Sequence, residues 1–240
     1  MPFFERDHVK LYYEEHGEGF PVLLVAPGGM RSAVPFWSNT PWNPIEHLSP
    51  HYRVIAMDQR NAGQSVGPIS ASDSWHTFTG DQLALLDHLG VDKFHVAGMC
   101  IGGPYIMGLI KAAPERVASA IVFQTIGLDN DRQLFYDMFD GWASELKAAR
   151  PDVSEATWVS FRNAMYSGDF LFNADRDFVR NCQTPMVVLM GNDAYHPELS
   201  SRELAELAPN AVFIEKWKEP EHQAAAKQII EQVLAENTPR

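Results

Sequence analysis

The chain has 240 residues and a formal net charge of -12 at neutral pH. This length suits one α/β domain with a large core and is short for two. The acidic balance argues against nucleic acid or an anionic membrane as a partner, because either would require clustered Lys and Arg. No apolar run approaches the roughly 20 residues of a membrane span, and no basic segment followed by an apolar one opens the chain. We expect a cytoplasmic protein with two free cysteines.

Strand-like and helix-like runs alternate along most of the chain. An outer strand is expected over 9–15, where apolar and polar residues alternate before two glycines. Buried strands are expected where apolar residues are consecutive: 21–26, 53–57, 94–97, 117–125, 184–191 and 211–214. Helices are expected over 75–89, 101–113, 197–207 and 222–236. This alternation predicts the α/β class, with a mostly parallel sheet covered by helices on both faces.

Residues 128–181 interrupt the alternation, because they show helical patterns and no strand pattern. Aromatic residues recur there at helical spacing: Phe135, Phe139 and Trp142 on one stripe, Trp158 and Phe161 on another. We interpret this segment as a helical cap inserted into a core made of 1–127 and 182–240. The alternative is a plain helical subdomain packed on the sheet edge, since aromatic stripes at this spacing are usually core.

The segment 98–103, Gly-Met-Cys-Ile-Gly-Gly, lies between a strand-like run and a helix-like run. A corner this sharp strains the backbone of its central residue, Cys100, and crowds the positions two before and two after it, where Gly98 and Gly102 stand. The same device, called a nucleophile elbow, presents the serine of G-x-S-x-G enzymes at a helix N-terminus. A tight turn with a small buried cysteine is the alternative interpretation.

An acid and a base follow later strands, as a site at the carboxyl edge of a parallel sheet requires. Asp193 follows the strand expected at 184–191, and His222 follows the last strand, so nucleophile, acid and base come in one of the known chain orders. Asp129 is a rival acid, because it also follows a strand. His196 is interpreted as a loop residue. For His222 itself, the alternative is an ordinary polar residue at the start of the last helix.

Several motifs in this order resemble those of the α/β-hydrolase superfamily over essentially the whole chain. Residues 27–29, Pro-Gly-Gly, resemble its His-Gly oxyanion loop, residues 58–65 its D-x-R-x-x-G-x-S turn, and residues 191–193 its acid loop. The resemblance implies an eight-stranded sheet with a small helical cap. Two positions depart from the family pattern, Pro27 in place of His and Cys100 in place of Ser.

The branch assignment within that superfamily is mixed. The cysteine elbow, G-x-C-x-G-G, matches the dienelactone-hydrolase branch, whereas the D-x-R-x-x-G-x-S turn and the long insertion resemble the capped esterases, lactonases and C–C hydrolases. An aspartate at the elbow would have implied an epoxide hydrolase or a haloalkane dehalogenase, and its absence argues against both.

The expected chemistry is nucleophilic attack by a thiolate. An imidazolium at His222 and the following helix N-terminus would lower the pKa of Cys100, and Asp193 would hold the imidazole tautomer. Backbone N–H groups of Ile101 and Gly29, with Met30 as a third candidate, would face the developing oxyanion.

The expected substrate is a small ester, lactone or thioester with an apolar or aromatic body. Its pocket would be lined by aromatic residues of the loop 36–42 and the insertion: Trp37, Trp42, Phe135, Phe139 and Trp142. Three alternatives stay open: acyl transfer through the same thioester, a small-ligand receptor on a hydrolase fold, and reversible oxidation of Cys100.

The remaining expectations are modest. Arg60 is expected to anchor its turn, and Cys182 to be a small core residue. Neither metal-binding nor phosphate-loop motifs occur, so no metal or cofactor is expected. A homodimer is left open.

Overall fold

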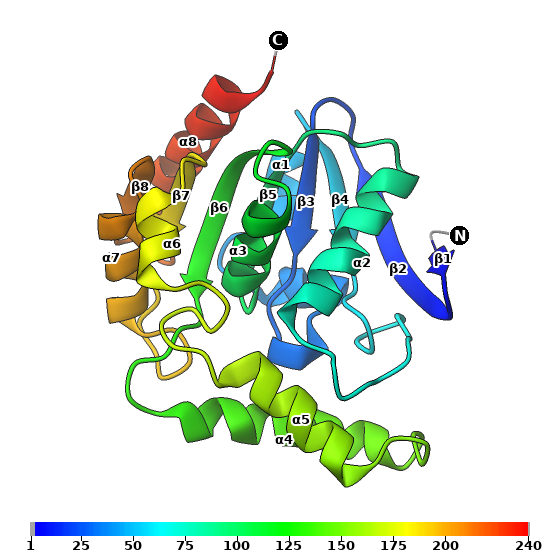
Figure 1. Cartoon of the computed structure of the whole chain (residues 1–240). Coiled ribbons are helices and arrows are strands. Elements are labelled where there is room, and N and C mark those ends of the chain that lie inside the picture. The colour runs from blue at the N-terminus through cyan, green and yellow to red at the C-terminus, as the bar shows by residue number, and fades with distance from the viewer. Residues whose placement is uncertain (1–2, 240) are drawn as a thin grey trace.

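Eight strands form one sheet in the order β1-β2-β4-β3-β5-β6-β7-β8 in the computed structural model, which describes residues 3–239 (Figure 1). Their bounds are β1 (Phe3–Arg6), β2 (Val9–His16), β3 (Pro21–Val25), β4 (Arg53–Met57), β5 (Phe94–Cys100), β6 (Val117–Thr125), β7 (Met186–Leu189) and β8 (Ala211–Ile214). β2 pairs antiparallel with both β1 and β4, and β3 to β8 run parallel to one another. The predicted eight-stranded, mostly parallel α/β sheet is confirmed.

The burial of each strand follows its position in the sheet. β5, near the middle, is buried at every residue, which is why its residues are apolar or small on both faces. β2, toward the edge, begins with alternate buried and partly exposed residues. β1 was not among the strands expected from the pattern, because four residues, Phe-Phe-Glu-Arg, are too few to show an alternation.

Helices cover both faces of the sheet. α2 (Trp75–His88) and α3 (Gly102–Ala112) lie on the face turned to the viewer in Figure 1, and α1 (Pro44–Leu48) lies behind the sheet. α7 (Glu198–Leu207) contacts β7 and β8, and α8 (Pro220–Asn237) contacts β6 and β7. Within the described residues, 3–239, no helix has both the length and the apolar character that a membrane crossing requires.

Two helices, α4 (Arg132–Lys147) and α5 (Glu155–Tyr166), lie together beyond the carboxyl ends of the strands (Figure 1). α6 (Arg176–Asn181) follows them and contacts α7. All three fall within 128–181, the segment that we interpret as a cap. The rings of Phe139 and Phe161 pack edge to face at 5.1 Å, which joins α4 to α5.

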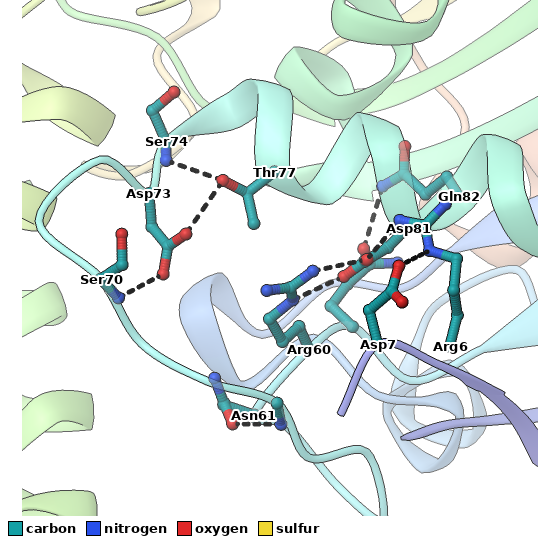
Figure 2. Close-up of polar contacts among 12 residues, drawn as sticks. Arg6, Asp7, Arg60, Asn61, Ser70, Asp73, Ser74, Thr77, Asp81 and Gln82 are labelled. Carbon is teal, nitrogen blue, oxygen red and sulfur yellow. Dashed lines mark hydrogen bonds and ion pairs between the residues drawn. The ribbon is translucent and has the colours of Figure 1, made fainter. Parts of the chain in front are cut away.

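Buried polar contacts hold the turn that follows β4. The Asp58 carboxylate accepts the backbone N–H groups of Val34 and Gln64, each at 2.7 Å. Arg60 donates to both carboxylate oxygens of Asp81 on α2, each at 2.7 Å, as Figure 2 shows. The side chain of Asp81 is only 2% exposed. Arg60 therefore anchors its turn, as predicted.

Candidate active site

Cys100 stands at the junction of β5 and α3 with a backbone φ of +62°, in the left-handed region that non-glycine residues rarely adopt. A Cβ atom on Gly98 would lie 2.9 Å from the carbonyl oxygen of Gly102, and one on Gly102 would lie 2.8 Å from that of Val25. Both positions therefore require glycine, as predicted. The strained corner raises a thiol to the end of the sheet, where it is 8% exposed.

The histidine beside Cys100 is His196. Its Nδ1 lies 2.8 Å from both carboxylate oxygens of Asp193. The hydrogen bond and the charge of Cys100 both act on the imidazole. The imidazole of His196 is therefore hydrogen bonded to Asp193 through Nδ1 and is influenced by the charge of Cys100.

The predicted pairing of Cys100 with His222 is corrected by this geometry. His222 lies in the first turn of α8, where its backbone N–H donates to the Glu219 carbonyl at 2.9 Å. The ionisable group that lowers the pKa of Cys100 is His196. After β8, the chain turns Trp217 inward, with its indole N–H donating to the Met190 carbonyl at 2.9 Å and its side chain 1% exposed.

His196 was interpreted from the sequence as a plain loop residue, and the structure corrects this as well. The loop after β7 folds back on Asp193, whose Oδ1 accepts the backbone N–H groups of Tyr195 at 3.0 Å and His196 at 3.1 Å. This local turn brings the imidazole onto the carboxylate three residues before it. The Asp-x-x-His spacing directly after a buried strand was the signal that could have found this pair.

The rival acid, Asp129, is exposed and accepts a hydrogen bond from the Asn130 amide at 2.8 Å. Asp193, whose side chain is half exposed, is the carboxylate on His196. Burial raises the pKa of Asp193, but the hydrogen bond and charge of His196 outweigh it and lower that pKa overall. The geometry favours Asp193 over Asp129 as the partner of the histidine.

The electrostatics of the site favour an ionised pair. Burial alone would raise the pKa of Cys100, but the hydrogen bond and charge of His196 and the N–H groups of Gly28 and Gly29 lower it overall. Burial alone would lower the pKa of His196, but Cys100 and Asp193 raise it to about 9. Cys100 and His196 therefore each favour the charged form of the other.

The loop after β3 points two backbone donors at the sulfur. Gly28 and Gly29 have φ values of +116° and +57°, and their N–H groups lower the pKa of Cys100. Gly29 was among the residues predicted to donate to the oxyanion, whereas Gly28 was not. The predicted oxyanion-hole roles of Met30 and Ile101 stay predictions. A Cβ on Gly29 would lie 2.5 Å from the Met138 sulfur, so α4 packs directly over this loop.

An open cleft of about 510 Å³ adjoins the acid loop. It is bordered by acidic side chains, including Asp129, Asp193 and Glu198, and by the apolar Leu134 and Phe135. Phe135 was predicted to line a substrate pocket. The cleft therefore combines an acidic rim with an apolar wall from α4.

The other four aromatic residues predicted for the pocket are nearly fully buried and do not border this cleft. Phe139 and Trp142 pack together at 5.3 Å within α4. Trp42 stacks on His47 at 4.7 Å, and Trp37 is 1% exposed. A pocket role for these four stays a prediction. Among the residues that the structure describes, no group of three or more His, Cys, Asp or Glu side chains is placed to hold a metal ion.

Comparisons with known proteins agree with this fold. A family model described as "alpha/beta hydrolase fold" matches residues 21–184, well over half of the chain. A relative from Azorhizobium caulinodans, named "Putative carbamate hydrolase RutD", is 39% identical over 125 residues, which span 51% of this chain and 43% of the relative. The 2-hydroxymuconate semialdehyde hydrolase of Pseudomonas putida is 27% identical over 263 residues, 92% of this chain and 89% of that protein.

Among solved structures, the enol-lactonase of Burkholderia xenovorans superposes with a TM-score of 0.71 at 18% identity, covering 98% of this chain and all of that one. At this identity the likeness shows a shared fold and nothing finer.

Proposed function

Because this chain belongs to the alpha/beta hydrolase fold family, we propose that it hydrolyses a small ester, lactone or thioester through an acyl-thioester formed on Cys100. The observation that carries the proposal is a buried thiol whose pKa is lowered by an imidazole, together with the carboxylate that holds Nδ1 of that imidazole. Relatives named for carbamate and semialdehyde hydrolysis support a carbonyl substrate.

In the first half-reaction the Cys100 thiolate attacks the carbonyl carbon, and the carbonyl oxygen becomes an oxyanion. The N–H groups of Gly28 and Gly29, which now face the sulfur, lie close enough to meet that charge. When the tetrahedral species collapses, the bond to the leaving oxygen or sulfur breaks, and Nε2 of His196 gives its proton to the leaving group.

In the second half-reaction His196, now neutral, takes a proton from water as the water oxygen attacks the thioester carbon. Collapse of this second tetrahedral species breaks the C–S bond, releases the acid and returns the sulfur as thiolate beside the imidazolium. Asp193 keeps its carboxylate on Nδ1 throughout, so that Nε2 is the nitrogen that exchanges the proton.

Cysteine at this position gives the proposed enzyme a thioester where a serine would give an ester. Both cysteines are free and buried, and a working thiolate requires a reducing compartment, which is why we place the protein in the cytoplasm. The cysteine elbow is the feature that resembles dienelactone hydrolases, and a nucleophilic role for Cys100 is part of this proposal.

The test is hydrolysis of p-nitrophenyl acetate and of a thioester panel by the wild type and four variants. Cys100→Ala should abolish turnover, and Cys100→Ser should keep weak esterase activity, because the same base serves an alcohol. His196→Gln should lower kcat/KM by about 100-fold or more, whereas the matched control, His222→Gln, should leave it unchanged. Full activity in Cys100→Ala would refute the proposal. Product analysis with added amine or thiol acceptors separates hydrolysis from acyl transfer.

A further inference from the structure

Two phenol hydroxyls near Cys100 are buried without a partner. Tyr105 on α3 is 1% exposed and Tyr166 at the end of α5 is 0% exposed, and neither hydroxyl has a hydrogen-bond partner within the described part of the chain, 3–239. Buried polar groups in folded proteins are nearly always hydrogen bonded. Both donors are therefore available to a bound molecule.

The two tyrosines belong to the Cys100 site. Tyr105 lies one helical turn beyond the elbow, and its backbone N–H donates to the Ile101 carbonyl at 3.3 Å. Tyr166 comes from the segment that we interpret as the cap. The ring of Trp75 packs edge to face on both, 5.5 Å from the Tyr105 ring and 5.8 Å from that of Tyr166. One hydroxyl is thus supplied by the core and the other by the segment over it.

Both phenols lie within range of the charge of Cys100, which raises the pKa of each in addition to the larger effect of burial. In the proposed reaction His196 protonates the leaving group, and the acyl group stays on Cys100. The two hydroxyls are therefore assigned to the acyl group that Cys100 carries.

The charges around the pair select the kind of acceptor. Burial raises the pKa of both phenols well above 10, so both hydroxyls stay protonated and donate. The negative charges of Cys100 and Asp81 act on Tyr105, and the cleft rim carries Asp129 and Glu198. A substrate carboxylate would meet like charges at each of these places, whereas a neutral oxygen would not.

We propose that Tyr105 and Tyr166 bind a neutral oxygen acceptor on the acyl portion of the substrate, such as an ether, hydroxyl or keto oxygen. This subsite selects acyl groups that carry such an oxygen over all-carbon acyl groups of the same shape. The inference rests on the proposed function, because it assigns the two hydroxyls to an acyl group attached to Cys100. The stacking of Phe135 on Tyr166 at 5.8 Å links the subsite to the wall of the open cleft.

The test uses p-nitrophenyl esters in isosteric pairs, methoxyacetate with butanoate and 3-methoxypropanoate with pentanoate, each rate divided by that of alkaline hydrolysis. The wild type should prefer the ether in at least one pair. Tyr105→Phe and Tyr166→Phe should each lower kcat/KM for that ether three- to tenfold, which is roughly the effect of losing one neutral hydrogen bond. The kcat/KM for the all-carbon ester of the same pair should stay unchanged. Tyr136→Phe, on the outer part of α4 where its ring stacks with Arg162, is the matched control and should change neither.

A second readout separates binding from support of the fold. Removing a hydroxyl that makes no contact within the chain should leave Tm equal or raise it, whereas removing a structural hydrogen bond or a permanently bound water would lower it. Equal rate changes for both members of each pair, or a lowered Tm with no change in preference, would overturn the subsite.

If the wild type turns over none of these esters, the proposed function fails and the subsite is tested by binding alone. Methoxyacetamide and 3-methoxypropanamide should then raise the Tm of the wild type more than butanamide and pentanamide at equal concentration. That difference should vanish in the Tyr105→Phe, Tyr166→Phe double variant. No difference in the wild type would overturn the subsite independently of catalysis.

Discussion

Replacing His196 by Gln should move the titration of Cys100 upward. The site raises the pKa of His196 from 6.5 to about 9, a preference for the imidazolium of roughly 3 kcal/mol at 1.36 kcal/mol per unit. Part of this free energy comes from the attraction between the imidazolium and the Cys100 thiolate. By linkage, the thiolate loses the same stabilisation when the imidazolium is removed. Because burial is the largest influence on the thiol and acts upward, we expect its pKa to rise and the thiolate fraction at a fixed pH to fall.

The assay is the rate of iodoacetamide alkylation against pH, supported by the ultraviolet absorbance of the thiolate. Both are measured in a Cys182→Ala background, so that Cys100 is the only thiol. His222→Gln is the matched control and should titrate like the parent. A titration in His196→Gln that matches the parent, or an upward shift in His222→Gln, would refute the assignment of His196 as the partner of the sulfur.

Three further predictions concern stability. Burial lowers the pKa of His95 to about 4. The neutral imidazole therefore contributes about 3 kcal/mol to the free energy of unfolding, which is complete above pH 6.5 and is lost as pH falls toward 4. Urea unfolding measured against pH should show a slope in this window that His95→Asn reduces, and an unchanged slope would contradict the prediction. Gly98→Ala should cost about 1–3 kcal/mol and most activity, because the new Cβ would lie 2.6 Å from the Val25 methyl; an unchanged Tm would count against the crowding. Asp81→Asn should destabilise the folded protein by about 3 kcal/mol, because it leaves the Arg60 guanidinium, whose side chain is 12% exposed, as an unpaired charge. A Tm within error of the wild type would contradict this and show that water reaches the guanidinium.

The parts of the site that were predictable from the sequence are those determined by neighbouring residues. The corner at Cys100 needs glycine two residues to either side, because a Cβ atom there would meet Val25 on the neighbouring strand β3 and, at Gly98, the Gly102 carbonyl as well. Asp193 was predictable because it directly follows a buried strand at the edge where such sites form. Both inferences needed only the local pattern and the general geometry of a parallel sheet.

The histidine was not predictable in the same way, because its choice depends on how two loops fold. His222 follows the last strand in the chain, but Pro220 begins α8 and places His222 in the first turn of that helix, while Trp217 fills the interior next to β7. His196 reaches Cys100 because the loop after β7 folds back on Asp193. The aromatic stripe posed a similar problem, since spacing alone does not separate Phe135, at the cleft, from Phe139, in the interior of the same helix pair.

The most direct test of the acyl-thioester is peptide mass spectrometry of protein quenched during turnover of p-nitrophenyl acetate. The account predicts an acetyl group on the peptide that contains Cys100, absent in Cys100→Ala and formed slowly in His196→Gln. Turnover at the wild-type rate in Cys100→Ala, or an acetyl group found only at another residue, would contradict it.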